Sequence, residues 1–597
     1  MYLIFLFVFM FGILFEVTGS NYILHFSSGK EHLMSEETIK LPKAVKSSLK
    51  KEVFLVLTNP ENPASEELSS NILQTLTYMD KQTEETSVSE LPINLEKYSG
   101  IIVTFEEINL VPNLAKITDY VAEGGSVFFA TRPGLNDSLL QIYRKLGIYE
   151  VGDFTEAHGI KLSSNILINH KDLVIDDQII ENSSLAVGIV DSCRVHATSV
   201  NHVPLLWDTN YKQGRFIVFN GTMLSSKENR GLLAGSISLM KDDFIYPIMN
   251  MKIAHIDDFP APLPTGSVKE IYNEHQMDTE SFFQKVWWPF IRDGAKKYDV
   301  TYTGFLIQSY NDQVKGPFTN EDGVQKETLI KYGRDLLKMG GEIGVHGYNH
   351  QPLTTSQQKI TGLGYNEWKN KQDMEESLAG LDKYVKSSFP SIKLNTYVPP
   401  SNILDETGLS AIHSALPSIN VISSLYSGNV DSNTYVQEYE SKGNFVHLPR
   451  ITSGYEFKDE TKWAMANSIT SIGVFSHFIH PDDFLDEERT SKKSWVDLEN
   501  EYNLMLGSIK EKFPWLRSMT TSEGAKTLQQ FAQSDIYISN KKNKVTVYCD
   551  NFSGAGYFLL RTDKLVGKVK NGTANKIDDG VYLVSIEKEI VEIGLVK

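Results

Sequence analysis

The sequence predicts an α/β protein in which two series of strand–helix units precede a small all-β module. Continuous apolar runs of five or six residues recur along the chain, and helical patterns separate most of them. Such alternation is typical of parallel sheets that are buried on both faces. The period shortens after about residue 535, where short strands alternate with Asn/Gly turns. With 597 residues, and about 150 per domain, three or four domains are expected.

Composition and charge exclude several classes of protein. Hydrophobic residues make up 41% and charged residues 22% of the chain, so a wholly disordered chain is excluded. With 58 Lys and Arg against 75 Asp and Glu, the formal charge is −17. We therefore expect no nucleic-acid partner, because binding to a phosphate backbone requires a basic face. The 2 cysteines allow at most one disulfide and no cysteine-rich metal site.

The first 20 residues indicate export. Residues 2–15 form an apolar run, which is too short for a comfortable membrane span of about 20 residues but suits a signal peptide. No Lys or Arg precedes the run, so an uncleaved membrane anchor is the alternative. Either interpretation places the protein outside the cytoplasm, as an extracellular or cell-surface protein. The polar, Lys-rich residues 21–50 are interpreted as a linker.

Residues 51–245 are predicted to form the first domain. Strands are expected at 53–57, 100–105, 126–130 and 215–219, with a helix over 117–123 that Gly124 and Gly125 end. This order resembles the flavodoxin-like fold of class I glutamine amidotransferase-like domains. That family has its nucleophile in a G-x-C-x-G turn, which is absent here. Cys193 lies in DSCRV and is interpreted as a structural thiol, so this domain is expected to be non-catalytic.

Residues 248–520 are predicted to form a (β/α) barrel, and residues 535–597 a small β domain. In the barrel region, strands are expected at 251–256, 301–307, 342–346, 393–398 and 472–479, and helices at 282–298, 329–339 and 373–387. Trp287 and Trp288 fit core packing better than a role in binding. The chemistry of such barrels lies at the carboxyl ends of the strands. In the tail, strands are expected at 544–549, 557–561 and 581–586.

The first chemical motif is an aspartate pair, Asp257 and Asp258. Most of the chain's five Asp-Asp pairs are interpreted as solvated turns, but this one directly follows the apolar strand that opens the barrel series. Two adjacent carboxylates at a strand end can divide labour, one binding a metal and the other acting as a base.

Two histidine motifs close later strands. His346 and His350 are four residues apart and can bind one metal if the chain turns after the strand. Two histidines with one aspartate leave open positions on the metal, as a catalytic site requires. His477 and His480 would point to opposite sides of a continuing strand, so one of the two is expected to act as a general acid and the other to be structural.

These motifs resemble those of the NodB-type polysaccharide deacetylases, which are carbohydrate esterases with a distorted (β/α)7 barrel. The resemblance implies that Asp257 is the general base and that Asp258, His346 and His350 bind a divalent metal, Zn²⁺ or else Co²⁺ or Ni²⁺. It implies an acid role for His477 or His480. The family's R-x-P-[YF] motif has its nearest match at residues 397–401, without the arginine, and we expect Arg450 to replace it. No D-x-x-D-W motif is present.

The resemblance implies an exported, metal-dependent N-deacetylase. Its substrate would be a polysaccharide of N-acetylated amino sugars, contacted by Tyr348, Tyr397 and Tyr455, and membrane proteins of exopolysaccharide synthesis would be its partners. The overall architecture also resembles bacterial exported proteins of the DUF2194 type and, more distantly, the deacetylase of Pel-type exopolysaccharide systems. Two alternatives stay open, namely another metal-dependent carbohydrate hydrolase on the same barrel and a non-catalytic glycan-binding or assembly component.

Overall fold

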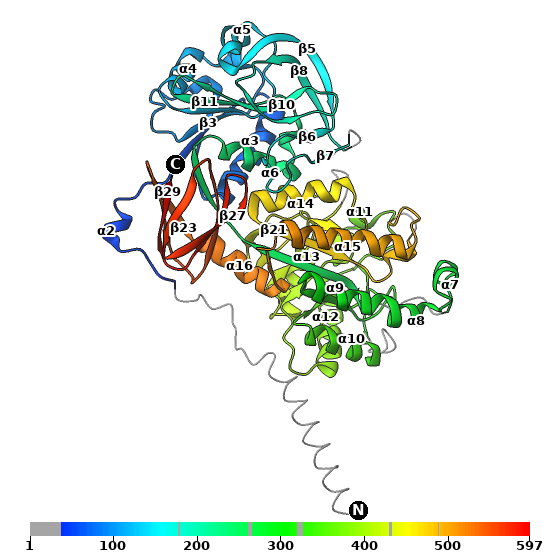
Figure 1. Ribbon diagram of the computed structural model, residues 1–597. Coiled ribbons are helices and arrows are strands. Elements are labelled where there is room, and N and C mark those ends of the chain that lie inside the picture. The colour runs from blue at the N-terminus through cyan, green and yellow to red at the C-terminus, as the bar shows by residue number, and fades with distance from the viewer. Residues whose placement is uncertain are drawn as a thin grey trace, which may run out of the picture.

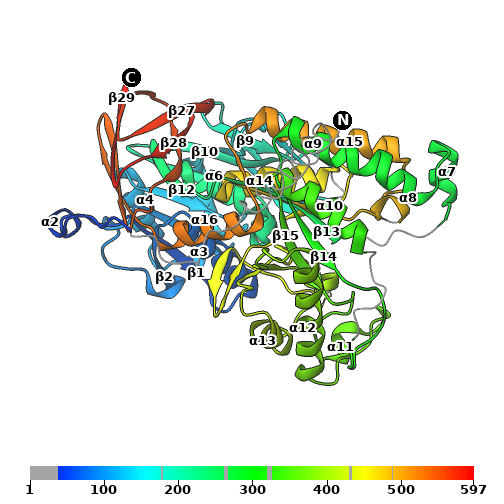
Figure 2. The same ribbon diagram turned by 90° about the horizontal axis from the view of Figure 1, so that it is seen from below.

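The protein is a mixed α/β molecule with a half-barrel sheet and additional all-β sheets (Figures 1 and 2). The computed structural model describes residues 38–176, 179–260, 266–318, 326–428, 433–486 and 489–596. The expected signal peptide or anchor, and residues 21–37 of the expected linker, lie outside the described residues. Within the described part, no helix combines the length and the apolar character needed to cross a membrane.

The first sheet has nine strands, of which five are parallel. The parallel strands are, in spatial order, β2 (Gln82–Ser87), β1 (Val53–Thr58), β3 (Gly100–Val103), β4 (Ser126–Phe129) and β11 (Gly214–Phe219). Four of them lie at the predicted positions, because continuous apolar runs fill buried strands. The predicted helix at 117–123 is α4 (Leu114–Ala122).

An antiparallel extension of this sheet was not predicted. It comprises β10 (Pro204–Tyr211), β9 (Arg194–Thr198), β6 (Ile160–Leu162) and β7 (Val174–Ile175), while β5 (Ile148–His158) pairs separately with β8 (Glu181–Ile189). The strands β5 and β8 mix buried with exposed positions, so no continuous apolar run marks them in the sequence.

The half-barrel sheet has ten strands. Its strands are, in spatial order, β18 (Glu440–Lys442), β19 (Phe445–His447), β17 (Val421–Ile422), β16 (Thr396–Tyr397), β15 (Glu342–Gly347), β14 (Tyr302–Ile307), β13 (Met251–Phe259), β21 (Val474–Ile479) and β20 (Thr452–Ser453). A tenth strand, β22 (Arg517–Ser518), pairs with β13. All pairings are parallel except that of β18 with β19. The segment that joins β19 to β20 connects the two flanks of the sheet, because the Arg450 amide donates to the Ser424 carbonyl and the Ile451 amide donates to the Ser476 carbonyl.

Helices accompany the half-barrel strands along the chain. They include α9 (Trp288–Tyr298), α10 (Lys326–Lys338), α12 (Lys371–Ser388), α14 (Asp459–Ile472) and α15 (Trp495–Lys512). The predicted helix at 282–298 divides into α8 (Thr279–Phe282), a π-helical turn at Phe283–Trp287, and α9. Trp287 and Trp288 are both buried and pack against neighbouring aromatic rings.

Two four-stranded sheets form the C-terminal module. One contains β23 (Asp535–Lys541), β24 (Lys544–Asp550), β29 (Ile590–Val596) and β26 (Leu565–Lys570), and the other contains β12 (Asp243–Ile248), β25 (Gly556–Thr562), β28 (Val581–Ile586) and β27 (Gly572–Asp578). The strand β12 comes from the connection between the first sheet and the half-barrel, and its residues pair with β25 from Asp243–Thr562 to Ile248–Tyr557. The sequence prediction left this strand out of the C-terminal module.

Close contacts join the three regions. The described part of the expected linker lies against the C-terminal module, because Ile39 forms a bridge with Phe552. The helix α6 (Arg230–Ser238) packs on α14 so closely that a Cβ added at Gly231 would lie 2.3 Å from the Cα of Asn467. Arg230 extends from α6 to Glu438 at 2.6 Å, beside β18. The helix α6 and the segment beside β18 therefore share a part-buried ion pair.

Candidate metal centre

The two aspartates of the site lie in an irregular part of β13. Asp258 has a φ of 54°, which is left-handed and uncommon for a residue other than glycine. The pairing of β13 with β14 also shifts register between Ile256 and Phe259. In a regular strand, consecutive side chains point to opposite faces. Here the irregularity lets Asp257 and Asp258 approach one site from adjacent positions, and such local strain is often found at functional sites.

Asp258, His346 and His350 form a cluster that could hold a metal ion. One ligand atom from each residue lies within 4.8 Å of the others. The Nε2 atoms of His346 and His350 lie 3.4 Å and 3.8 Å from Oδ1 of Asp258. His346 belongs to β15, and the chain turns directly after it at Gly347, where φ is 116°. This turn brings His350 back beside His346.

The other nitrogen of each histidine is held by a neighbouring group. Nδ1 of His346 lies 2.8 Å from the Val398 carbonyl oxygen, so Nδ1 donates and Nε2 is left with its lone pair. Nδ1 of His350 lies 3.1 Å from the Tyr365 hydroxyl. Such outer contacts fix the ring orientation of metal-binding histidines.

The donor set fits a divalent metal such as Zn²⁺. Burial lowers the pKa of His346 and of His350 to about 4, so both rings are neutral near pH 7. In the described part of the chain, the buried Oδ1 atoms of Asp257 and Asp258 have no hydrogen-bond partner. Two neutral imidazoles and one carboxylate make a common catalytic zinc set that leaves one position for water or substrate.

Asp257 is clamped by Arg450. Nη1 of the fully buried Arg450 donates to Oδ2 of Asp257, and Nη2 donates to Oδ1 of Asn402. The guanidinium carbon also lies 3.9 Å from the centroid of the Phe478 ring. Burial raises the pKa of Asp257, but Arg450, His346 and His480 together lower it to about 2. Asp257 is therefore ionised at any ordinary pH.

The structure places the two candidate acids in different surroundings. His480 lies next to Asp257, with Nε2 3.8 Å from Oδ2, and its Nδ1 lies 3.0 Å from Oδ1 of Asp483. Burial lowers the pKa of His480, but Asp483, Asp257 and Asp258 raise it to about 9. His477 instead lies between Thr452 and the Gly454 carbonyl, outside the cavity lining, and burial lowers its pKa to about 4.

A cavity of about 420 Å³ opens over these groups. Its lining includes Asp257, His346, His350 and His480. Tyr455 also borders it, but the ring is buried, and the hydroxyl accepts from Trp287 and donates to the His480 carbonyl. Tyr348 and Tyr397 are buried and do not border the cavity. Tyr348 and Tyr397, two of the three tyrosines expected to contact the substrate, therefore lie packed behind the cavity surface.

Sequence reasoning missed four residues at the site. Tyr310 stacks on His350, and its hydroxyl lies beside Asp258, while Tyr365 contacts His350 from a distant loop. Asn402 holds the second nitrogen of Arg450. Asp483 lies in one of the chain's five Asp-Asp pairs, most of which are interpreted as solvated turns. Its position three residues after His480 was the one available signal.

The fold and the site together define a mixed α/β protein whose half-barrel sheet carries an Asp-His-His cluster at the carboxyl ends of its strands. The chain belongs to the bacterial family DUF2194, described as "Uncharacterised protein conserved in bacteria". The family's sequence model matches residues 33–190 and 180–583, which is most of the chain.

Comparisons with other known proteins add little. No curated protein matches the chain. Cytoplasmic protein STM1381 from Salmonella typhimurium LT2 is 14% identical, with 32% of this chain and 99% of that one covered and a TM-score of 0.26. The exo-beta-1,4-mannosidase Op5Man5 from Opitutaceae bacterium strain TAV5 is 12% identical over 33% of this chain and 38% of its own, with a TM-score of 0.25. Likenesses this weak carry no argument about function.

Proposed function

We propose that this protein is an exported, metal-dependent N-deacetylase acting on a polysaccharide that contains N-acetylated amino sugars. The observation that carries the proposal is the arrangement around Asp257. A cluster suited to a metal lies beside it, and both a buried arginine and a protonated histidine contact its carboxylate.

Two features of the fold support the NodB-like interpretation. The half-barrel sheet fits the distorted (β/α)7 barrel of that family, with the site at the carboxyl ends of its strands. Residues 397–401, the nearest match to that family's arginine motif, contain no arginine, and Arg450 supplies a guanidinium from the segment between β19 and β20. The parallel order β2-β1-β3-β4-β11 is that of flavodoxin-like sheets, which supports the same assignment for the first domain.

In the proposed reaction, each residue of the site has a separate role. Asp258, His346 and His350 would hold the metal, which supplies a Lewis acid for the amide carbonyl and an acidified water. Asp257, kept ionised by Arg450, accepts the proton of the attacking water. His480 donates its proton to the amide nitrogen as the C–N bond breaks, and acetate and a free amine are formed. Asp483 orients His480 for this transfer.

The first experiment joins metal content with activity. The protein is purified from residue 21 onward, its bound metal is measured by mass spectrometry, and acetate release from N-acetylated oligosaccharides is assayed. We expect about one metal per chain and acetate release that a chelator abolishes, and we expect His346→Ala to lose both. Metal without acetate release would favour another hydrolase, and absence of metal would refute the Asp258, His346 and His350 site.

Localisation and partners follow from the same proposal. The apolar residues 2–15 would direct the chain to the cell surface or beyond, either as a cleaved signal or as an anchor. Membrane proteins of exopolysaccharide synthesis would then be its natural partners, because the polymer emerges from them.

A further inference from the structure

A serine, a histidine and an aspartate form a hydrogen-bonded chain in the first sheet and the loop beside it. Oγ of Ser164 lies 2.8 Å from Nδ1 of His196, and Nε2 of His196 lies 2.7 Å from Oδ1 of Asp208. None of these residues borders the metal-site cavity. A nucleophile beside a base that a third group orients is the arrangement of Ser-His-Asp hydrolases, and it recurs on unrelated folds.

Three neighbouring antiparallel strands bring these side chains together. The strand β9 lies between β10, which carries Asp208, and β6, which Ser164 follows. The residues on either side of His196 pair with consecutive residues of β10, Leu206 and Trp207, so His196 is the extra residue of a β-bulge. The Ser163 amide donates to the His196 carbonyl at 2.8 Å, which holds the segment after β6 beside the histidine. Bulges redirect side chains and are often found next to active sites.

The carboxylate of Asp208 sets the direction of the hydrogen bonds. It is buried, and Nε and Nη2 of Arg194 each donate to it at 3.1 Å. Burial raises the pKa of Asp208, but His196 and Arg194 together lower it below its ordinary value. An ionised carboxylate only accepts, so Nε2 of a neutral His196 ring donates to Asp208. The lone pair of Nδ1 is then left to accept the Ser164 hydroxyl proton.

The two ring nitrogens are exchanged relative to serine proteases, where Nε2 faces the serine and Nδ1 the aspartate. The exchange leaves the proton transfer unchanged, because the transfer requires only a lone pair that faces the hydroxyl. Ser164 is partly exposed, and the amides of Ser164 and Asn165 donate to no residue in the described part of the chain. Both amides are close to Oγ along the chain and can therefore donate to a developing oxyanion.

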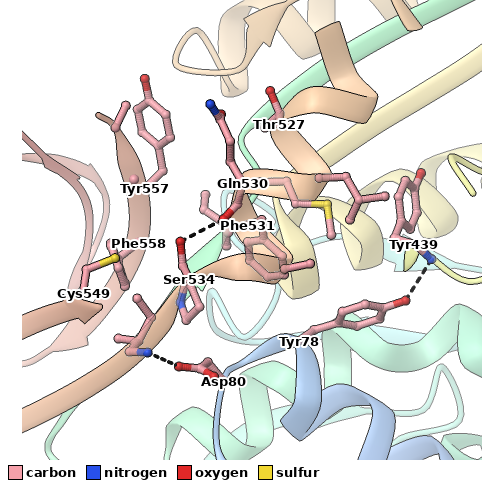
Figure 3. A pocket seen from close by; sticks show the side chains of 18 of the residues that line it. Tyr78, Asp80, Tyr439, Thr527, Gln530, Phe531, Ser534, Cys549, Tyr557 and Phe558 are labelled. Carbon is pink, nitrogen blue, oxygen red and sulfur yellow. Dashed lines mark hydrogen bonds between the residues drawn. The ribbon is translucent and has the colours of Figure 1, made fainter. Parts of the chain in front are cut away.

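The cavity at the junction of the three regions contains no such pair of nucleophile and base. It has a volume of about 470 Å³ and lies where the helix α16 (Thr521–Gln533) meets the C-terminal sheets. Its described lining includes Ser534 and Cys549 but no histidine, and Ser534 donates to the Gln530 carbonyl at 2.8 Å (Figure 3). Burial raises the pKa of Cys549 to about 12, so its thiol stays protonated and unreactive.

We propose that Ser164, His196 and Asp208 form a second hydrolytic site, which cleaves esters of short acyl groups. Ser164 borders neither the metal-site cavity nor the junction cavity, so neither cavity can take up a long acyl chain bound to this serine. The first domain was expected to be non-catalytic because it lacks the turn that carries a nucleophilic cysteine, but a serine site does not require that turn. The inference goes beyond the proposed function and does not depend on the metal centre.

The reaction proceeds through an acyl-serine. Oγ of Ser164 attacks the carbonyl carbon of the ester while its proton passes to Nδ1 of His196. His196 gives this proton to the alcohol oxygen as the bond between that oxygen and the acyl carbon breaks. Water then attacks the acyl-serine, its proton passes through His196 to Oγ, and the carboxylic acid is released. Asp208 keeps its hydrogen bond to Nε2 and stabilises the imidazolium that forms.

A fluorophosphonate probe and chromogenic esters test this site. The chain from residue 21 onward is incubated with the probe in the presence of a chelator, which removes any contribution from the metal centre, and the labelled peptide is identified by mass spectrometry. We expect the label on Ser164. Ser164→Ala and His196→Gln should each lower kcat/KM for p-nitrophenyl acetate by about 10²-fold or more. The octanoate ester should be cleaved more slowly than the acetate.

Asp208 has a positioning role, which a separate variant measures. Asp208→Asn should lower kcat by about 10²-fold or more and leave KM nearly unchanged, because Asp208 contacts the ring and not the substrate. A change confined to KM would contradict this role. Thermal melting confirms that each variant is folded.

Ser163→Ala is the matched control. Ser163 is exposed and adjacent to Ser164, and its side chain has no hydrogen bond to a described residue, so labelling and hydrolysis should stay unchanged. The absence of label on Ser164, hydrolysis that Ser164→Ala does not lower, or undiminished labelling in His196→Gln would overturn the inference. Faster cleavage of the octanoate ester would overturn the assigned substrate class. Acetate release from N-acetylated oligosaccharides is assayed in parallel without chelator, so the two sites can fail independently.

Discussion

The contacts of the Asp257 carboxylate distinguish it from the adjacent carboxylate of Asp258. It is buried and contacts Arg450 and His480, while the adjacent Asp258 faces the two histidines of the cluster. This division follows from the irregular backbone of β13, where Asp258 adopts a left-handed conformation. Two chemically identical side chains are thereby given different contacts.

The role of Asp257 as the base can be tested by one conservative change. Asp257→Asn preserves the shape of the side chain and one oxygen for Arg450 but cannot accept the proton of water. We expect metal content to stay unchanged while kcat falls by about 10²–10⁴-fold. Metal analysis and acetate release measure the two effects, and turnover close to that of the unmodified protein would refute the base assignment.

The alkaline limit of activity should depend on Asp483. His480 must be protonated to act as an acid, and its pKa of about 9 means that activity should fall as the pH rises through about 9. Asp483→Asn removes a negative charge that raises this pKa. The variant's alkaline limb should therefore move to lower pH, by about 1–2 units.

The pH profile of kcat/KM measures this shift. Asp486→Asn is the matched control, because Asp486 also pairs with Arg489, at 3.3 Å, but no ion pair joins it to His480 among the described residues. An alkaline limb that stays in place in Asp483→Asn, or one that moves equally in both variants, would contradict the assigned role of Asp483.

At the scale of elements, the sequence marks long buried strands well and short ones poorly. The runs that became β1, β13, β14, β15 and β21 are continuous and apolar because helices or other layers bury both faces of these strands. In contrast, the strand expected at 393–398 is reduced to the two residues of β16, and β17, which also has two residues, leaves no periodic signal. The edge pairing of β12 depends on a partner more than 300 residues away, which local patterns cannot report.

The residues of the candidate site also fall into two groups, those marked by a local motif and those that come from distant segments of the chain. Asp257, Asp258, His346 and His350 were found from local motifs at the ends of long strands. Arg450 was a hypothesis drawn from a missing motif, and the structure places it against Asp257. Tyr365 and Asn402 lie in irregular segments between strands, where no spacing indicates which group they will contact.

The contact between α6 and α14 requires a glycine. A Cβ at Gly231 would lie 2.3 Å from the Cα and 2.4 Å from the carbonyl oxygen of Asn467, and neither backbone atom can move away easily. We expect Gly231→Ala to lower the free energy of unfolding by about 1–3 kcal/mol. Denaturant titration measures the change.

Gly294 provides the matched control for that change. It also lies in a helix, α9, but a Cβ there would meet no atom within 4 Å. Gly294→Ala should raise the free energy of unfolding by about 0.5–1 kcal/mol, because alanine loses less backbone freedom on folding. Equal effects of the two substitutions would show that the helix contact is not limited by space.

At the scale of the whole molecule, buried ion pairs connect regions that are distant in sequence. Glu52, next to β1, pairs with Lys241 and with Lys81 at 2.5 Å, and Lys81 also donates to the Ile245 carbonyl of β12 at 3.1 Å. These contacts join the first sheet to β12, the strand that pairs with β25 in the C-terminal module.

Removing the charge of Glu52 should destabilise the protein in a pH-dependent way. Burial raises the pKa of Glu52, but Lys81 and Lys241 lower it from 4.5 to about 2. The stability that it contributes is therefore complete above about pH 4.5 and is lost as the pH falls toward 2. Near pH 7, Glu52→Gln leaves the buried Lys81 without its counter-charge and should cost about 3 kcal/mol.

Denaturant titration at several pH values tests this expectation. The difference between the unmodified protein and Glu52→Gln should shrink steadily below about pH 4.5. Glu61→Gln, at an exposed position with no ion pair among the described residues, should show almost no difference at any pH. A Glu52→Gln deficit that is the same at pH 3 and pH 7 would contradict the assignment.

The strand β12 is synthesised long before β25, the strand with which it pairs. Asp243 and its partner Thr562 are 319 residues apart, so a ribosome adding about 5–20 residues per second needs about 15–60 s to supply the partner. During that time β12 presents unpaired backbone groups, which can pair with a strand of another nascent chain. A chain that stops before residue 556 never supplies β25, and its aggregation would then reflect a missing partner rather than a faulty sequence.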